Sequence, residues 1–362
     1  MNLNIDKDLW QYLAETDKKI VMYGMGNGAD KILRVCADRG IEVCDFFASD
    51  GFVRGHSFHG KTVLSYSEAK AKYGSDNMIV LLSFASSLPD VIENILRVAS
   101  ECELYAPDVP VFGTTLFDME FYRSNVARIE AVYDILADEE SKKIFENTVA
   151  YKLTGRIDYL EAAVSSKDEV YSELLRADKI KVCIDLGAYN GDTVRELALY
   201  APRLEKVIAL EPDRRNFKKL SSYAEGEDRF EVVPINAAAW RKESVLEFAA
   251  DGNRNSNVSC GGKVVQISGI MVDSAAEGLD VDYIKYDVEG SEEEALIGSA
   301  DTVRRTLPTL LVSVYHRSED VFKLPELVRE ISSGYKLYLR RYRYIPAWDL
   351  NLICLPLNND CC

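Results

Sequence analysis

The most informative stretch of the sequence for chemistry is Asp185-Leu-Gly-Ala-Tyr-Asn-Gly-Asp-Thr193, in which acidic residues flank two glycines. The apolar residues 182–186, which lead into this stretch, are typical of a buried strand in a parallel sheet. Gly187 and Gly191 allow the chain to turn tightly and to approach a ligand closely. We therefore expect a ligand site in this loop, at the carboxyl edge of a sheet.

The acids of this loop indicate the kind of ligand. A dinucleotide-binding loop reads Gly-x-Gly-x-x-Gly, and here Asp185 and Asp192 would repel a pyrophosphate. The pattern suits a ligand with a cationic end and no phosphates, such as S-adenosylmethionine, which carries a sulfonium and an ammonium on an adenosine. A second predicted strand, residues 206–210, ends at Glu211, which is placed to accept both ribose hydroxyls. An ordinary α/β turn is the alternative interpretation.

Four motifs together resemble the FkbM-type class I methyltransferases: residues 185–193, Glu211-Pro-Asp213, Lys285-Tyr-Asp-Val-Glu-Gly290 and Val312-Ser-Val-Tyr-His-Arg317. The resemblance covers roughly residues 140–357. Many class I methyltransferases share the first two motifs, whereas the last two are much more specific to this family. The resemblance implies an S-adenosylmethionine cofactor, a Rossmann-like seven-stranded sheet with an antiparallel last strand, and O-methylation of sugar or polyketide hydroxyls. We predict O-methylation of a sugar or sugar-nucleotide hydroxyl, with the acceptor held partly by the first domain.

The predicted cofactor contacts lie at the ends of several strands of this sheet. In the class I fold the third strand, here residues 229–235, ends beside the adenine, so Asn236 or Ala237 would meet the adenine edge. The predicted cofactor-binding set is Asp185, Gly187, Ala188, Tyr189, Gly191, Asp192, Thr193, Glu211, Pro212, Asp213, Asn236, Ala237 and Asp287.

His316 and Asp287 are the predicted catalytic residues. His316 follows the predicted strand 309–315, Asp287 ends the neighbouring strand, and both should face the cofactor cleft. A sugar hydroxyl is a poor nucleophile, and a neutral imidazole could take its proton. The alternative is a histidine that orients the substrate or bonds to the backbone.

Glu289 and Arg317 are the predicted substrate contacts. Asp287 and Glu289 could instead hold a divalent metal, but no Asp-Asn pair follows in the usual relation, so we predict no metal. Arg317 and the basic run 340–344 could bind an acidic or phosphorylated sugar, with a solvated strand face as the alternative.

The surrounding sequence predicts an α/β protein in three parts. Residues 1–112 read as a smaller N-terminal Rossmann-like β/α domain, residues 113–178 as a helical connector, and residues 179–357 as the methyltransferase domain. Capping boxes at Thr193-x-x-Glu196 and Ser291-x-x-Glu294 predict two helix starts. The polar residues 251–262, at the tip of a predicted hairpin, suit a substrate lid or a solvated turn.

Composition limits the possible partners. The formal charge of −16 argues against nucleic acid or an anionic membrane surface as a partner. No signal peptide and no long apolar run is evident, and the eight cysteines form no Cys-x-x-Cys pair. We therefore expect a cytoplasmic protein with reduced thiols, no membrane insertion, and a small-molecule or glycan acceptor. A homodimer is compatible with the sequence.

The first domain carries a second glycine loop, which supports a different function. Gly24-x-Gly26-x-x-Ala29 follows a predicted strand, and Asp45 or Asp50 could act as its ribose acid. An NAD-dependent enzyme that modifies sugar nucleotides is one alternative, although no Tyr-x-x-x-Lys pair follows. A non-catalytic protein that binds the cofactor is another.

Overall fold

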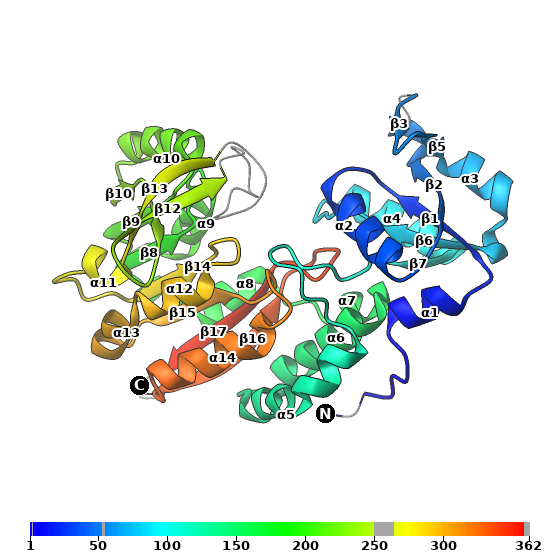
Figure 1. Ribbon diagram of the computed structural model, residues 1–362. Coiled ribbons are helices and arrows are strands. Elements are labelled where there is room, and N and C mark those ends of the chain that lie inside the picture. Colours follow the sequence, from blue (N-terminus) through cyan, green and yellow to red (C-terminus); the bar gives the residue numbers. More distant parts are fainter. Residues whose placement is uncertain (2, 53–54, 250–263, 358–362) are drawn as a thin grey trace.

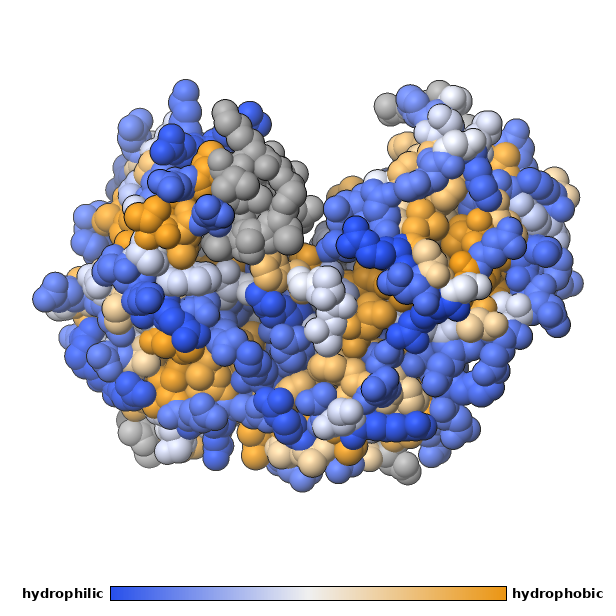
Figure 2. All heavy atoms as spheres, viewed as in Figure 1, coloured by the Kyte–Doolittle hydropathy of each residue, from blue (hydrophilic) through white to orange (hydrophobic). Residues whose placement is uncertain are grey.

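The computed structural model describes residues 1, 3–52, 55–249 and 264–357. The predicted lid, residues 251–262, therefore lies outside the described residues. Two α/β units stand side by side on a base of helices, and the space-filling view shows the surface notched between them (Figures 1 and 2). Among the described residues, no helix is long and apolar enough to cross a membrane.

The N-terminal unit is a five-stranded parallel sheet in the order β5-β2-β1-β6-β7. One face is covered by α1 and α2, whose apolar residues join Ile20 and Met22 in one cluster, and the other by α3 and α4. The elements are α1 (Leu9–Glu15), β1 (Lys19–Tyr23), α2 (Asn27–Asp38), β2 (Val43–Ala48), β3 (Ser57–Phe58), β4 (Lys61–Thr62), β5 (Leu64–Ser65), α3 (Tyr66–Tyr73), β6 (Met78–Leu82), α4 (Pro89–Glu101) and β7 (Glu103–Tyr105).

The second unit has the seven-stranded sheet expected of a class I methyltransferase, in the order β10-β9-β8-β14-β15-β17-β16. The first five strands are parallel, and β17 pairs antiparallel with both β15 and β16. The strands are β8 (Val182–Leu186), β9 (Lys206–Leu210), β10 (Glu231–Ile235), β14 (Tyr283–Tyr286), β15 (Thr309–Ser313), β16 (Tyr335–Arg341) and β17 (Leu350–Pro356). The fold prediction is confirmed, because these strands are the apolar runs identified from sequence.

Helices cover both faces of this sheet. Buried residues of α9 and α10 pack on one face and those of α12, α13 and α14 on the other. The helices are α9 (Asp192–Tyr200), α10 (Arg214–Gly226), α11 (Val272–Ala275), α12 (Glu292–Ile297), α13 (Ala300–Thr306) and α14 (Asp320–Ile331). A small sheet of β11 (Ala237–Ala239), β12 (Ser244–Ala249) and β13 (Val264–Ile270) includes the predicted hairpin.

Two predicted capping boxes are wrong, although the helices begin where expected. Neither Gly191, which precedes α9, nor Ser291, which precedes α12, caps its helix with a side-chain hydrogen bond. The Thr193 hydroxyl bonds to Asp185 instead, and Glu294 bonds to Arg241. Tertiary partners therefore compete successfully with the local capping interaction.

The helical connector joins the two units. Its elements are α5 (Met119–Ile135), α6 (Glu139–Thr154), α7 (Ile157–Glu161), α8 (Lys167–Glu169), a π-helical turn (Val170–Leu174) and a 3₁₀ turn (Ala177–Lys179). Buried residues of α5 and α6 pack in the core of the seven-stranded sheet, whereas Tyr151 and Leu160 pack in the core of the N-terminal sheet. The connector therefore contributes buried side chains to the hydrophobic cores of both units.

Two further segments carry contacts between the units. In the chain between β7 and α5, the Phe112 N–H donates to the His316 carbonyl oxygen at 2.9 Å. In the loop between β16 and β17, Ile345 pairs with Ser86 of the N-terminal unit through two backbone hydrogen bonds of 2.9 and 3.0 Å. Both segments also reach the cavity described below.

Candidate active site

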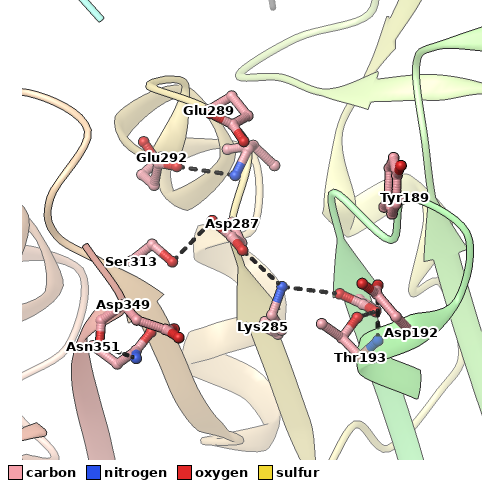
Figure 3. Close-up of polar contacts among 12 residues, drawn as sticks. Tyr189, Asp192, Thr193, Lys285, Asp287, Glu289, Glu292, Ser313, Asp349 and Asn351 are labelled. Carbon is pink, nitrogen blue, oxygen red and sulfur yellow. Dashed lines mark hydrogen bonds and ion pairs between the residues drawn. The ribbon is translucent and has the colours of Figure 1, made fainter. Parts of the chain in front are cut away.

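A cavity of about 440 Å³ lies at the carboxyl ends of the parallel strands. Its walls come from the loops after β8, β9, β10, β14 and β15, from the π-helical turn, and from the loop between β16 and β17. Figure 3 shows polar side chains that follow β8 and β14, together with others from β15 and β17 and the loop before β17, around a common space. The carboxyl edge is the position at which open α/β sheets bind ligands.

The glycine loop borders the cavity, but its glycines serve packing. Gly187 and Gly191 both have φ +83°, so the turn needs residues without a side chain. A Cβ on Gly187 would lie 1.9 Å from the Asp287 carbonyl oxygen, and one on Gly191 would lie 2.4 Å from the Tyr223 ring. These glycines therefore allow a close approach to neighbouring protein groups, and since Gly187 also lines the cavity, their close approach to a ligand stays a prediction.

Asp185 lies beneath the cavity and does not line it. Its carboxylate accepts a hydrogen bond from the Thr193 hydroxyl and lies 3.6 Å from the Lys285 ammonium. Burial raises the pKa of Asp185, against the opposing effects of Lys285 and Thr193. The residue holds the start of α9 and the end of β14 in place, rather than contacting a ligand directly.

Glu211 lines the cavity at the end of β9, as predicted. Its carboxylate accepts N–H groups of Tyr189 at 2.9 Å and Asp213 at 2.8 Å, which fix its orientation. Burial raises the pKa of Glu211 to about 7, because these hydrogen bonds offset only part of the desolvation. A carboxylate held in this way can accept hydrogen bonds from a diol.

Several predicted cofactor contacts have other roles. Asp213 caps α10 by accepting the N–H groups of Arg215 and Asn216. The Asn236 amide donates to the carbonyl oxygens of Glu211 and Pro212, so it ties two loops together. Of the predicted cofactor set, the residues that line the cavity are Gly187, Tyr189, Asp192, Thr193, Glu211, Pro212, Ala237 and Asp287, whereas Asp185, Ala188, Gly191, Asp213 and Asn236 do not.

These residues fit S-adenosylmethionine on the chemistry of the site. Ala237, Ala238 and Ala239 leave a small, apolar wall beside Leu210 that suits a flat purine. Glu211 provides the acceptor for the ribose. The acids around the loop suit a cationic sulfonium and ammonium, and would oppose a pyrophosphate.

Asp287 lies in the middle of the cavity wall, between the predicted cofactor side and the β15–β17 side (Figure 3). Its carboxylate accepts hydrogen bonds from Lys285 at 3.2 Å and Ser313 at 3.0 Å. Burial alone would raise the pKa of Asp287, but Lys285 and His316 outweigh it and hold that pKa below its usual value. Asp287 is therefore an ionised, oriented acceptor facing the cavity.

His316 does not fit its predicted role as the base. Its side chain is fully buried and does not line the cavity. The ring nitrogens lie 2.9 Å from Glu292, 3.5 Å from Glu289 and 3.7 Å from Asp287. Burial alone would lower the pKa of His316, but Glu292, together with the other two carboxylates, raises it to about 10. The ring therefore carries a proton at neutral pH and cannot accept another.

The same cluster bears on the prediction about metal. Asp287, Glu292 and His316 each place one possible ligand atom within 4.8 Å of the others. Glu292, however, already accepts the Val288 N–H at 2.9 Å. We interpret the cluster as ion pairs around a charged imidazole, and the absence of a bound metal stays a prediction. Glu289 lines the cavity, and burial raises its pKa to about 7 despite the nearby His316.

The basic residues proposed to bind an acidic sugar are occupied elsewhere. Arg317 donates to the Gly290 carbonyl oxygen and stacks on the Phe112 ring, with 4.1 Å from the guanidinium carbon to the ring centroid. Arg340 pairs with Asp138 at 2.6 Å, and Arg341 is fully buried among backbone carbonyl oxygens. None of the three lines the cavity.

The sequence analysis missed one side of the cavity. The loop between β16 and β17 contributes Tyr344, Trp348 and Asp349, and β17 contributes Asn351. Trp348 packs near Tyr344 and Tyr315, with ring centroids 5.5 and 6.4 Å apart. The aromatic run 342–348 was visible in the sequence, but its approach to Tyr315 depends on the antiparallel return of β17. Further lining residues that were not predicted are Val111, Lys167, Glu196, Leu210, Asn216, Ala238, Ala239, Lys285, Val288, Ser291, Leu311 and Tyr342.

The N-terminal glycine loop differs from this site. Asp45 accepts hydrogen bonds from Lys72 and Tyr73, and Asp50 accepts them from Ser67. Both candidate ribose acids are therefore engaged by their own domain. His59, in the loop with His56, pairs with Asp30 at 2.7 Å.

Comparisons with known proteins agree with this geometry. Residues 185–345 match the model of the methyltransferase FkbM domain. The solved structure of methyltransferase FkbM from Methylobacillus flagellatus KT aligns over 95% of this chain and 92% of its own, with a TM-score of 0.72 and 20% identity, which shows a shared fold. An rRNA methylase from Streptococcus thermophilus aligns over 54% of this chain and 100% of its own, at 13% identity, but its TM-score of 0.37 is too low to support an argument. No curated protein matches the sequence.

The family model spans the glycine loop, Glu211, Asp287 and the aromatic loop up to Ile345. The family implies S-adenosylmethionine as the cofactor, and the cavity has the acceptor for its ribose and the apolar wall for its adenine. Residues 185–345 therefore form a methyltransferase domain of the FkbM family, and the protein is an S-adenosylmethionine-dependent methyltransferase.

Proposed function

We propose that this enzyme transfers the methyl group to a hydroxyl oxygen of a sugar or a sugar-like acceptor. The observation that carries the proposal is the β15–β17 side of the cavity, where Tyr315, Tyr344 and Trp348 lie beside Asp349 and Asn351. A sugar ring presents apolar C–H faces that pack on aromatic rings, and hydroxyl groups that bond to carboxylates and amides. This composition fits a sugar better than a flat aromatic or an aliphatic acceptor.

The bound cofactor supplies a methyl group activated by its sulfonium, so the protein has to orient the acceptor and exclude water. Asp287 lies between the two sides of the cavity and is ionised. Its carboxylate can accept the hydrogen bond of the acceptor hydroxyl and take the proton as the oxygen becomes more acidic during transfer. Lys285 and Ser313 hold the carboxylate in position for this role.

The test measures methyl transfer from labelled S-adenosylmethionine to a panel of glycosides, with the site of the new methyl group identified by NMR. Asp287→Asn should lower the rate of the chemical step by about 10²–10⁴-fold. Its affinity for S-adenosylhomocysteine should change much less, because the ribose and adenine contacts remain. Ser313→Ala removes one hydrogen bond to Asp287 and should cost less than Asp287→Asn.

Methylation of nitrogen or carbon instead of oxygen would overturn the proposal. So would an Asp287→Asn enzyme that keeps the wild-type rate. Binding of NAD at the N-terminal glycine loop, measured by calorimetry, would revive the alternative of a sugar-nucleotide enzyme, which the engagement of Asp45 and Asp50 disfavours.

A further inference from the structure

The N-terminal unit reaches the methyltransferase cavity through the chain between β7 and α5. We call residues 106–118 of this chain the strap, which runs between the two units (Figure 1). Val111, in the middle of the strap, lines the cavity, whereas the other described lining residues all lie at Lys167 or later in the chain. Val111 is therefore the contribution of the N-terminal part of the described chain to the wall of the active site.

A single peptide group holds Val111 between the two units. Its carbonyl oxygen, that of Val111, accepts a hydrogen bond from the Lys31 ammonium of α2 at 2.7 Å, and the same ammonium donates to the Pro110 carbonyl oxygen at 2.9 Å. Its N–H, that of Phe112, donates to the His316 carbonyl oxygen of the methyltransferase unit at 2.9 Å. Hydrogen bonds from a charged donor are stronger than neutral ones, so Lys31 is the firmer of the two attachments.

The methyltransferase unit receives the strap on the acceptor side of the cavity. Gly290 has φ +91°, and a Cβ there would lie 2.7 Å from the Phe112 side chain. Arg317 stacks on the same ring and donates to the Gly290 carbonyl oxygen at 2.9 Å. These contacts follow β14 and β15, next to Glu289 in the chain, and not the strands that carry the predicted adenine and ribose contacts. We therefore place Val111 on the acceptor side.

The strap is anchored at other points that do not involve Lys31. Asp108 pairs with the buried Lys152 at 3.0 Å, and the Thr115 carbonyl oxygen accepts the Ser318 hydroxyl at 2.6 Å. Removing the Lys31 ammonium should therefore shift the middle of the strap without detaching it. This makes the role of Lys31 testable in a folded protein.

The position of Lys31 gives the N-terminal glycine loop a use that needs no nucleotide. A Cβ on Gly28 would collide with the Ser83 carbonyl oxygen, so this glycine packs the start of α2 against the end of β6. Lys31 follows within one turn of the same helix. The close packing of the loop thus fixes the helix that carries the lysine.

We infer that Lys31 is a positioning residue for methyl transfer, which holds Val111 against the acceptor and makes the N-terminal unit part of the acceptor site. A β-branched side chain has few rotamers, so fixing the backbone of Val111 also fixes its methyl groups. The inference rests on the proposed function for the acceptor, a sugar hydroxyl. It adds a recognition role for the N-terminal unit.

The first test measures kinetics with the glycoside that the wild type methylates best. Lys31→Met should raise the acceptor KM by about tenfold, while kcat and the affinity for S-adenosylhomocysteine change little. Lys31→Arg keeps a charged donor and should restore most of the loss. The matched control is Lys61→Met, because the Lys61 ammonium also donates to two successive carbonyl oxygens, those of Val43 and Cys44, but within the N-terminal unit. It should leave the KM unchanged.

A double-mutant cycle tests whether Lys31 acts through Val111. Val111→Ala should raise the acceptor KM by about tenfold, because two methyl groups that pack on the acceptor are lost. Lys31→Met should then have little further effect in the Val111→Ala background, since residues that act as a unit are not additive. Additive effects, or a Lys31→Met enzyme with the wild-type KM, would overturn the inference while leaving sugar O-methylation intact.

Hydrogen exchange tests the positioning without an acceptor. The Phe112 N–H should exchange faster in Lys31→Met than in the wild type, and at the wild-type rate in Lys61→Met. Methyl transfer to none of the glycosides would count against the proposed function, and faster exchange at Phe112 would still support the positioning by Lys31. Unchanged exchange at Phe112 in Lys31→Met would overturn the inference whatever the acceptor is.

Discussion

The molecule contains two glycine loops that look alike in sequence, and their comparison shows which residues carry binding information. A Cβ on Gly28 would lie 2.1 Å from the Ser83 carbonyl oxygen, and one on Gly187 would lie 1.9 Å from that of Asp287. In both units a glycine therefore packs against the end of the neighbouring strand. The glycine pattern reports this packing in an α/β unit, whether or not a ligand binds there.

The acids distinguish the two loops. Glu211 faces the cavity and is held by backbone N–H groups, which leaves oxygen lone pairs for a ligand. Asp45 instead accepts the side chains of Lys72 and Tyr73. Burial would raise the pKa of Asp45, but Lys72 and Tyr73 outweigh it and lower that pKa. A buried acid whose charge is balanced within its own domain stabilises that domain. Asp45 fits this description, whereas Glu211 does not.

The largest expected effect tests the packing role of the glycines. Gly187→Ala forces a Cβ against a backbone carbonyl at a positive φ, so we expect the free energy of unfolding to fall by about 3–5 kcal/mol. Gly40→Ala, in the N-terminal unit, is the matched control, because φ is +69° there but no atom lies within 4 Å of the added Cβ. It should cost only the backbone strain, about 1–2 kcal/mol. Chemical denaturation measures both, and equal losses would contradict the packing argument.

The second prediction concerns the buried His316 and the three carboxylates around it. The described residues of the N-terminal unit contain no group of three acids around one histidine. His316→Asn leaves Glu292, Glu289 and Asp287 without their shared cation, so we expect a loss of about 3 kcal/mol of stability. Because the folded pKa of His316 is raised to about 10, its stabilising contribution is complete below the ordinary histidine pKa, about 6.5, and is lost as pH rises toward 10.

The melting temperature of the wild type should therefore fall between pH 7 and pH 10, and that of His316→Asn should fall less. His59→Asn is the control, since His59 is about half exposed and pairs with Asp30 alone. A wild type and a His316→Asn variant with parallel pH profiles would show that the imidazole is not charged in the folded protein.

The smallest effect concerns the pH dependence of cofactor binding. Since the pKa of Glu211 is raised to about 7, its carboxylate is mostly protonated at pH 6 and mostly ionised at pH 8. The affinity for S-adenosylhomocysteine should then rise by about tenfold from pH 6 to pH 8. Glu211→Gln should flatten this dependence, and Asp45→Asn should keep it. Calorimetry at several pH values measures the affinities. If the wild type binds with an affinity that does not depend on pH, Glu211 does not bind the ribose.

The sequence by itself determined the strands of the seven-stranded sheet and the loops that border the cavity. Apolar runs such as 182–186 and 206–210 become strands with those bounds, because a strand buried on both faces has few alternatives. Glu211 and Asp287 could be placed at the ligand edge because they directly follow such strands. The antiparallel return of residues 350–356 followed from the family resemblance and is also observed.

Only the tertiary structure decided the state and surroundings of the charged groups. His316 is adjacent in sequence to exposed-looking polar residues, yet the fold buries it among carboxylates from another loop, and this reverses its expected protonation. Trp348 and Asp349 reach the cavity because β17 runs back between β15 and β16 and because Ser86 holds the preceding loop at Ile345. Local patterns encode strands and turns, whereas pKa values and cavity walls depend on contacts between segments that are distant in the chain.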